Sequence, residues 1–393
     1  MFKTQDFKIK TKFIERNNGT VDGTWLCGID IGYSSVKIFS PNNVAMFPSF
    51  AEKDRSRQIG TPGESFIKYK NLENGEEWIV GDVAQKNIRQ SDTSYNDNAL
   101  YGRERYDDPM FLVLIDTALG LSCKKNNLGD PSGKEIKIES GLPSAYLDSD
   151  KPLLSRALSG RHHFSLKIGA KKEEIFDITI KEENIDIMEQ PMGTLMSIAI
   201  NNDHRFTRDA NNFFNKNVII FDGGHGTLDT FVIKGNRVLD RQTFPEYAMK
   251  EVLNQTIAKI RKDLQIEVSP VAIQKALENG YVIRHDRFSS ENVEFKDILE
   301  EENDKIFNDA IENIGRSYPL FEYDYFVITG GTGSAWSEKI KDKLKGVSGL
   351  TIINANQNDA DLPFDFANVR GYYMFLYQNE LTKQRLSNKK ENK

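Results

Sequence analysis

The chain is poor in cysteine and has no long apolar run. Its two cysteines, Cys27 and Cys123, stand far apart among 393 residues, and neither a CxxC nor an HExxH sequence occurs. This usage favours two buried thiols in a reducing compartment over a disulfide framework or a zinc site. No run reaches the ~18 apolar residues that a membrane-spanning helix needs, and the N-terminus lacks the apolar core of a signal peptide. We therefore expect a cytoplasmic protein with no membrane partner.

The chain also lacks an excess of positive charge. It has 52 Lys and Arg against 58 Asp and Glu, a net charge of −6. A broad nucleic-acid-binding surface requires a basic balance, so we do not expect direct binding to DNA or RNA. What is present is 38% hydrophobic residues, with 24 Phe and 14 Tyr. This composition is typical of a globular protein, and the length indicates two or three domain-sized units.

Strand-like runs alternate with helical patterns, which predicts an α/β fold. The runs "WLCGIDIG", "SVKIFS" and "VAMFPSF" predict three successive strands, and "DDPMFLVLIDTALGLS" predicts a helix from Pro109. The polar residues 1–20 are expected to form a loose extension. Residues 246–318 are expected to be helical, because apolar residues recur there at three- and four-residue spacing.

Two glycine-containing turns repeat one pattern. In "GIDIGYSSVK" and in "FDGGHGTLD", an apolar strand ends in an aspartate, a glycine follows two residues later, and a second strand begins. Lys37 follows Asp30 at the same interval at which Asp229 follows Asp222. The matching spacing indicates an internal duplication. Either turn taken alone favours an ordinary hairpin, since an aspartate followed two residues later by glycine is common, and the repetition favours a shared function.

The composition of these turns suits phosphate binding. Glycine leaves backbone N–H groups uncovered, and consecutive N–H groups form an anion-binding concavity. An aspartate repels phosphate, but it can hold water on a magnesium ion that neutralises the phosphates. Lys37 can reach the same anion. A third loop, "VITGGTGS", follows a strand and precedes a helix, which suits a loop beneath a flat ring or ribose as well as a plain turn; no Walker loop is present.

In this order, the three loops resemble those of the actin, sugar-kinase and DnaK-type chaperone superfamily. "GIDIGYSSVK" looks like its first phosphate loop, "FDGGHGTLD" like its second and "VITGGTGS" like its adenosine loop. "IDIMEQPMGTLMSIAI" resembles the connecting helix that supplies a catalytic polar residue. The runs "ENGEEWIVGDVAQ", "IESGLP" and "FANVRGYY" are similar to patterns in bacterial actin-like proteins of the ParM type. The chain is too short for a chaperone, and it shows no convincing sugar-binding loop.

The resemblance implies an actin-like, ribonuclease H-like duplicated fold with two lobes and a nucleotide cleft between them. The parts that it implies are, in chain order, an N-terminal extension (1–20), domain I (21–188) with a small subdomain around 49–82, domain II (189–352) with a helical subdomain around 246–318, and a return to domain I with the tail (353–393).

The resemblance also implies roles for individual residues. Asp30 and Asp222 are expected to hold Mg²⁺ mainly through water. The residues expected to bind the phosphates are Gly32, Tyr33, Ser34, Ser35 and Lys37 at the first turn, and Gly223, Gly224, His225, Gly226 and Thr227 at the second. A partly exposed turn histidine is an equally good interpretation of His225. The residues expected near the ribose and base are Gly330, Gly331 and Thr332, with Lys275 or Glu278 from the smaller lobe.

Hydrolysis requires a group that orients water in line with the γ-phosphorus. The connecting helix offers Glu189 and Gln190, and the spacing to Gly193 favours Gln190, which would position the water rather than deprotonate it. The alternative is that both residues simply begin a helix, where an acid suits the dipole. Asp229 is expected to orient the same water, or is a plain strand aspartate. With Asp222, these residues form the expected catalytic set.

The activity that the resemblance implies is a filament-forming ATPase, or GTPase, that uses Mg²⁺ and disassembles after hydrolysis. The implied partners are further subunits and a centromere-binding adaptor protein on plasmid DNA. Three alternatives stay open: a phage or chromosomal filament with other cargo, a monomeric small-molecule kinase on the same fold, and a scaffold that senses nucleotide without turnover.

Overall fold

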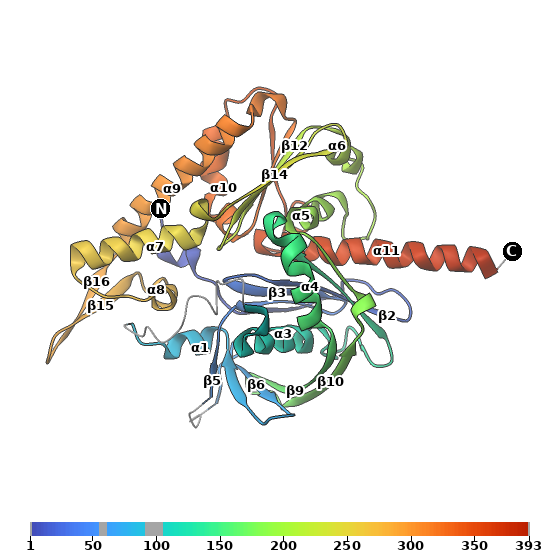
Figure 1. Ribbon diagram of the computed structural model, residues 1–393, viewed down its shortest axis with the longest axis horizontal. Coiled ribbons are helices and arrows are strands. Elements are labelled where there is room, and N and C mark those ends of the chain that lie inside the picture. The colour runs from blue at the N-terminus through green and yellow to red at the C-terminus, as the bar shows by residue number, and fades with distance from the viewer. Residues whose placement is uncertain (1, 55–60, 91–104, 392–393) are drawn as a thin grey trace.

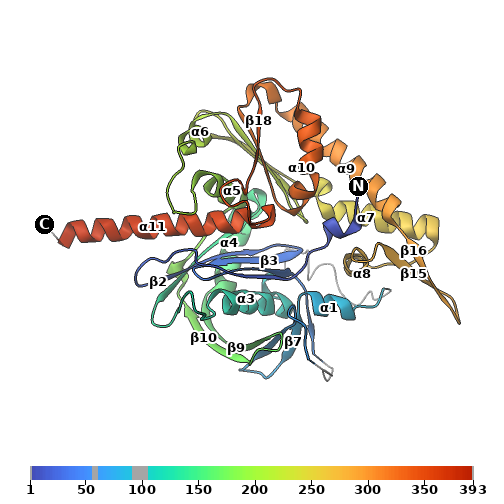
Figure 2. The same cartoon turned by 180° about the vertical axis from the view of Figure 1, so that it is seen from behind.

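The computed structural model describes residues 2–54, 61–90 and 105–391. Figure 1 shows two lobes, with domain I below and domain II above, and the long helix α11 (Ala367–Glu391) running between them before it projects at the C-terminus. Figure 2 shows the same arrangement from behind. Helix α11 therefore lies where the two lobes meet.

Domain I is built on a six-stranded sheet in the order β1-β4-β3-β2-β8-β11. Strands β2, β3 and β4 form an antiparallel meander, β8 pairs in parallel with β2, and β11 pairs in parallel with β8. The strands are β1 (Lys12–Glu15), β2 (Thr24–Ile31), β3 (Ser35–Ser40), β4 (Asn43–Pro48), β8 (Glu135–Leu142) and β11 (Ile185–Glu189). Helix α3 (Pro109–Ser122) covers one face and α11 the other, so β2 and β4 are buried along their whole lengths.

Domain II repeats this topology in a five-stranded sheet of order β14-β13-β12-β17-β18. The strands are β12 (Val218–Gly223), β13 (Leu228–Ile233), β14 (Val238–Phe244), β17 (Tyr325–Thr329) and β18 (Thr351–Asn354). Each of these five strands has a counterpart in the domain I sheet with the same neighbours and the same direction. Strand β1 of domain I is the additional sixth strand. The duplication that the two turns indicated therefore extends through both sheets.

A second sheet in domain I has the order β10-β9-β6-β7-β5 and forms the small subdomain. Its strands are β5 (Ala51–Lys53), β6 (Ile67–Asn71), β7 (Glu77–Val80), β9 (Gly160–Ile168) and β10 (Glu174–Ile180). The expected range 49–82 includes the first three strands, and residues 55–60 within it lie outside the described residues. Helices α1 (Asp82–Asn87) and α4 (Leu147–Leu158) follow β7 and β8 in the chain.

The helical subdomain of domain II contains a hairpin that the sequence analysis did not expect. Its helices are α7 (Met249–Lys259), α8 (Pro270–Ala276) and α9 (Lys296–Ser317). Between α8 and α9, β15 (Tyr281–His285) pairs with β16 (Ser290–Glu294), so the prediction of helix throughout 246–318 is wrong at this point. Gly280, at φ +76°, ends the preceding helical segment, and the β-branched and aromatic residues after it favour a strand.

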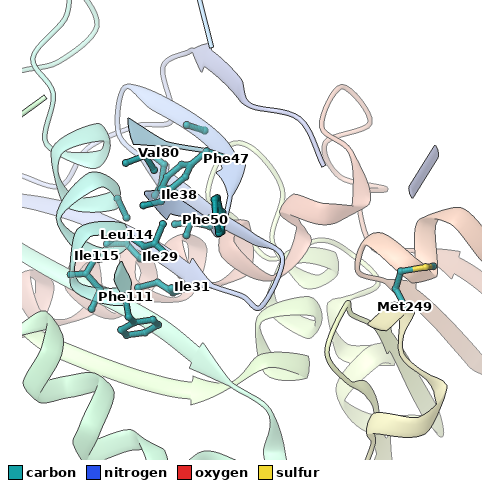
Figure 3. Close-up of a cluster of buried hydrophobic side chains, with 14 of the residues drawn as sticks. Ile29, Ile31, Ile38, Phe47, Phe50, Val80, Phe111, Leu114, Ile115 and Met249 are labelled. Carbon is teal, nitrogen blue, oxygen red and sulfur yellow. The ribbon is translucent and has the colours of Figure 1, made fainter. Parts of the chain in front are cut away.

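The core of domain I lies between its large sheet and α3. Ile29 and Ile38 from the sheet face Phe111 and Leu114 of the helix, and all four are almost fully buried. Figure 3 shows this cluster, with Met249 of domain II well apart from it. Burial of each such side chain contributes about 1.5–3 kcal/mol. The packing fixes β2, and with it the turn that follows Asp30.

The two domains are joined where α5 (Gln190–Ala199) crosses α11. A Cβ on Gly371 would lie 1.7 Å from the carbonyl oxygen of Gly193, and a Cβ on Gly193 would lie 2.4 Å from the ring of Tyr372. Only glycine permits so close an approach. Helix α6 (Ala210–Asn215) and helix α10 (Gly331–Leu344) complete domain II.

Residues 2–20 are not the loose extension that we expected. Residues Thr4–Phe7 form a 3₁₀ turn, η1, and β1 pairs antiparallel with β4 at the edge of the domain I sheet. In "FKIKTKF", Phe7, Ile9, Thr11 and Phe13 alternate with lysines, and the run leads into β1 at Lys12; the lysines obscured this period-two signal.

Cys27 and Cys123 are both buried and free, as expected. Over residues 2–54, 61–90 and 105–391, no helix combines the length and the apolar character that crossing a bilayer requires.

Candidate functional site

A cavity of about 900 Å³ lies between the two domains. Both acidic turns, the third glycine loop and the start of α5 contribute to its walls. The sequence-predicted residues that line it are Asp30, Gly32, Tyr33, Ser34, Ser35, Lys37, Gln190, Asp222, Gly224, His225, Gly226, Thr227, Gly330, Gly331 and Thr332. Segments nearly 300 residues apart in the chain therefore meet around one space.

The two acidic turns have the same local geometry. Gly32 N–H donates to the carbonyl of Ser35 at 3.0 Å, and Gly224 N–H donates to the carbonyl of Thr227 at 2.9 Å. In the strands that lead to these turns, Asp30 pairs with Lys37 and Asp222 pairs with Asp229. The duplication is thus maintained down to individual hydrogen bonds.

The turns also touch each other across the cavity. A Cβ on Gly226 would lie 2.2 Å from the ring of Tyr33, so glycine is required where the second turn meets this side chain. The guanidinium of Arg105 lies 4.6 Å from the centre of the same ring and donates to the carbonyl of Ile31 at 3.1 Å. Tyr33 therefore lies between the second turn and a cation.

The third loop packs against the second turn. Gly330 has φ +79°, and a Cβ there would lie 2.3 Å from the Gly223 carbonyl oxygen and 2.6 Å from Oδ1 of Asp222. Both the positive φ and the close approach exclude any other residue. Thr332 Oγ1 donates to the Gly224 carbonyl at 2.7 Å. The loop and the turn consequently form one continuous wall.

The first turn carries a compensated charge. Lys37 Nζ lies 3.2 Å from Oδ2 of Asp30, and the lysine side chain is mostly buried. Burial acts to lower the pKa of Lys37, but Asp30, Asp365 and Asp222 together outweigh it and raise that pKa. Gln190 Nε2 donates to Oδ1 of Asp30 at 3.4 Å. The lysine is therefore charged at neutral pH and lies beside the connecting helix.

The second turn carries two buried acids. Asp222 accepts a hydrogen bond from Asn368 Nδ2 at 2.7 Å, and burial raises its pKa to about 6. Asp229 accepts from Thr227 Oγ1 at 2.8 Å and from Thr243 Oγ1 at 2.5 Å, and burial raises its pKa to about 7. Unlike the first turn, this one places no cation opposite its aspartate.

His225 is half-buried at the tip of the second turn. Its carbonyl accepts from the backbone N–H of Lys250 at 2.8 Å. Burial, and then the charge of Lys250, lower the pKa of the imidazole to about 4. The side chain is therefore neutral near pH 7, where it can contribute a hydrogen bond but no positive charge.

Five of the predicted residues lie outside the cavity lining. Gly223 belongs to β12 behind its turn, and Asp229 lies behind Thr227. Glu189 pairs with Arg241 rather than with the cavity residues. Lys275 Nζ donates to the carbonyls of Lys86 and Ile88 at 2.6 and 3.1 Å, and Glu278 accepts from Lys10 Nζ at 3.0 Å. Lys275 is therefore bonded across to the end of α1 and Glu278 to the N-terminal segment, and neither residue lines the cavity.

The cavity also contains residues that the sequence analysis did not single out. A Cβ on Gly331 would lie 2.8 Å from Oδ1 of Asp365, which also raises the pKa of Lys37. Asp365 directly precedes "FANVRGYY", the run that resembles ParM-type proteins, and this position is the sequence feature that could have indicated it. Arg105 and several residues before position 13 line the cavity too, and no motif indicated them.

The side chains at the two turns fit a magnesium ion held through water. Asp30 and Asp222 line the same cavity and both act on Lys37, so their carboxylates face a shared region. Carboxylate and water oxygens are the ligands that Mg²⁺ prefers, and a cation would offset the burial of Asp222. Over the described ranges, no group of three or more His, Cys, Asp or Glu side chains could hold a metal.

Comparison with known proteins gives one family match and several structural matches. The family described as "Actin like proteins N terminal domain" matches residues 28–193. The chain is similar to a non-polymerisable quadruple mutant of pCBH ParM, with 19% identity, a TM-score of 0.69, and coverage of 90% of this chain and 99% of that one. No curated protein matches the sequence.

Two further structures extend the comparison. The 15-stranded ParM filament from Clostridium botulinum shares 18% identity at a TM-score of 0.66, covering 91% of this chain and 99% of that one. An archaeal actin homologue in complex with ADP shares 16% identity at a TM-score of 0.60, covering 90% and 100%. Likeness at these identities shows the fold, which here extends over nearly the whole of each chain. The chain therefore has the fold of these actin-like proteins, and its residues 28–193 match the N-terminal domain of that family.

Proposed function

We propose that the protein is a nucleoside triphosphatase that uses ATP or GTP with Mg²⁺, assembles into filaments in the cytoplasm and segregates plasmid DNA. The observation that carries this proposal is the single cavity lined by both acidic turns and the third loop. A nucleotide bound there contacts both domains at once. Its triphosphate or diphosphate state can therefore determine how the domains are arranged, as a polymer controlled by hydrolysis requires.

The backbone N–H groups of the two turns bind the phosphate chain, and Lys37 adds a buried positive charge to it. Asp30 and Asp222 hold the water shell of Mg²⁺, which neutralises the phosphates when it is bound. Gly330, Gly331 and Thr332 lie beyond the second turn, where they adjoin the nucleoside.

Gln190 orients the attacking water. It lines the cavity at the start of α5 and hydrogen-bonds Asp30, so its amide faces the phosphate site. An amide can position a water molecule but cannot take its proton near pH 7. Asp229 acts indirectly: it accepts the hydroxyl hydrogen of Thr227, which itself lines the cavity. Glu189 is occupied by Arg241 and is the weaker candidate.

The filament part of the proposal is supported by the similarity to the ParM filament of Clostridium botulinum. In a head-to-tail polymer of this chain, each subunit would present the same two lobes to its neighbours. The plasmid part of the proposal rests on the likeness to ParM proteins. A centromere-binding adaptor protein would connect the filament to DNA. A phage or chromosomal cargo would require a different adaptor.

Light scattering and phosphate release, recorded together after ATP or GTP is added with Mg²⁺, test the proposal. A filament-forming triphosphatase gives a rise in scattering, then phosphate release, then a fall in scattering. Phosphoryl transfer to a sugar without scattering would replace the proposal with a small-molecule kinase. Tight binding with background phosphate release would replace it with a nucleotide-sensing scaffold. Co-sedimentation with the adaptor and its DNA site tests the cargo.

A further inference from the structure

Residues 2–11, termed here the N-terminal strap, cross the mouth of the cleft. They precede the matched family domain at 28–193. On the domain I side, Lys8 Nζ donates to Oε1 of Gln85 at 2.7 Å, and the backbone N–H of Thr11 donates to Oδ2 of Asp82 at 2.9 Å. Both acceptors belong to α1. The strap then continues into β1, so its C-terminal end is held by the domain I sheet.

The strap also bonds to domain II, just after α8. Thr4 Oγ1 donates to the carbonyl of Leu277 at 2.9 Å, and Thr4 is buried. Gln5 Nε2 donates to the carbonyl of Glu278 at 2.8 Å, and Lys10 Nζ lies 3.0 Å from Oε1 of the same residue. One short segment is therefore anchored on both lobes.

The lobe tips meet beneath the strap without its help. Gln90 Nε2 donates to the carbonyl of Ile283 at 2.8 Å, and its Oε1 accepts from the backbone N–H of Ile283 at 2.7 Å. Lys275 adds its bonds to the last turn of α1. The strap is thus a second layer over a contact that is already made, and its removal leaves the tip contact in place.

The strap lines the same cavity as the two acidic turns. Its lining residues are Phe2, Gln5, Asp6, Phe7, Lys8, Ile9 and Lys10. Figures 1 and 2 both show the N-terminal turn beside α7 and α10, and η1 contacts α10. Helix α10 begins at the third loop and contributes Ser334 and Glu338 to the cavity. The strap is therefore part of the cavity wall beside α10.

We propose that the N-terminal strap forms the wall over the nucleoside and retards release of the nucleotide. The inference rests on the proposed function, because a phosphate chain gripped between the two turns directs the nucleoside along α10 towards the strap. Phe7 and Phe2 lie there with ring centroids 5.3 Å apart. An aromatic face is a surface on which any base can stack, so the strap would serve purine nucleotides without selecting between them.

The test uses the full chain and compares two ligands, a fluorescent ATP analogue and inorganic tripolyphosphate. The variant Phe7→Ala combined with Thr4→Ala removes an aromatic face and one bond across the cleft. We expect its nucleotide dissociation constant to rise about 10-fold, with faster release, because stacking and a hydrogen bond are lost. Binding of tripolyphosphate should stay within about twofold, since the two turns are untouched.

Two further variants separate contact from folding. Phe7→Leu retains apolar volume but loses the ring, so it should weaken the nucleotide and leave the unfolding temperature unchanged. Lys3→Ala is the matched control, because Lys3 is exposed in the same segment and does not line the cavity. It should behave as the wild type in every assay.

The outcomes distinguish this inference from the proposed function. If the strap variants weaken nucleotide and tripolyphosphate equally, or change neither, the strap is not a nucleoside wall and the inference is overturned. If the wild type binds tripolyphosphate and the nucleotide with equal affinity, no wall over the nucleoside exists. If the wild type binds neither ligand, the proposed function fails as well.

Discussion

The two acidic turns of this protein share a backbone but differ in the residue that faces the aspartate. In the first turn, Asp30 faces Lys37 across a 3.2 Å ion pair. In the second, Asp222 faces Asp229, and burial raises the pKa of both acids. The same hydrogen bond closes both turns. We call the first turn balanced, because its aspartate faces a lysine, and the second turn unbalanced, because its aspartate faces another acid.

This difference indicates a division of labour between the two turns. A lysine beside the first aspartate is suited to hold phosphate, because it supplies the positive charge that the anion requires. A second turn with two acids is suited to hold a hydrated cation and to order its water. Under the proposed function, Lys37 would offset part of the phosphate charge and the acids of the second turn would hold the water shell of the metal, so each turn would supply what the other lacks. Substitutions in the first turn should therefore mainly weaken nucleotide binding, and substitutions in the second turn should mainly slow hydrolysis.

The largest effect is expected from Asp222→Ala. Without this carboxylate the hydrated metal loses one of its two anchors, and phosphate release should fall by at least about 100-fold. The assay is steady-state phosphate release at saturating nucleotide and Mg²⁺.

Asp222→Asn is the control for the hydrogen bond to α11, because an amide still offers an oxygen to Asn368 Nδ2. Equal loss in the two variants assigns the effect to the charge. Near-normal turnover in Asp222→Asn would show that the residue acts through its hydrogen bond to Asn368 and would remove it from the metal site.

Gln190→Ala is expected to slow hydrolysis about 10- to 100-fold while nucleotide binding and assembly stay near normal, because it removes only the group that orients water. Filaments of this variant should persist longer in light scattering. Glu189→Ala is the adjacent comparison, since Glu189 pairs with Arg241 outside the cavity lining. A greater loss of hydrolysis in Glu189→Ala would exchange the two roles.

Most of the fold, and the meeting of the two turns with the third loop around one cavity, could be predicted from the sequence, because the information is local. Each turn needs glycine where its backbone is approached closely, and Gly226, Gly330 and Gly224 show such approaches. A strand followed by an aspartate and a glycine is a short pattern, and its repetition made it specific. Pro109 likewise marked the start of α3 correctly.

The α10 end of the cavity could not be predicted, because it is assembled by contacts between distant segments. Lys275 and Glu278 lie on a helical segment at the right lobe, yet they bond to residues near positions 86 and 10 of the chain. The strap itself has a strand-like alternation in which lysines hide the apolar residues. The packing of the whole domain determines which distant residues these side chains contact, and a local sequence pattern does not record it.

Lys37→Met tests the balanced turn and should weaken nucleotide binding about 10-fold, because a charged hydrogen bond to the phosphates is lost. Asp229→Asn tests the unbalanced turn and should change binding less than threefold while it lowers turnover. Titration with a fluorescent nucleotide measures both. Equal losses of affinity would contradict the division of labour between the turns.

The two sheets differ at a second matched position. Gly28 pairs with Glu139 on β8, two residues before the first aspartate, and Ile220 pairs with Val327 on β17, two residues before the second. Val327 is fully buried and apolar. Glu139 is equally buried, and neither of its carboxylate oxygens has a hydrogen-bond partner. Domain I therefore has an acid where domain II has a valine.

Glu139→Gln should give the smallest effect, a pH-dependent gain in stability. Burial, and then the charge of Asp186, raise the pKa of Glu139 to about 9 from an ordinary value of 4.5. Between these two values the folded chain holds a proton that the unfolded chain releases, so the stability of the wild type falls as pH rises through the window. Glutamine does not titrate, so the unfolding temperature of the variant should gain about 3 °C on the wild type between pH 5.5 and 8.

Glu135→Gln, at the exposed start of the same strand, should show no such gain. Thermal unfolding in matched buffers measures both variants, and parallel pH profiles for Glu139→Gln and the wild type would mean that the carboxylate is solvated in solution.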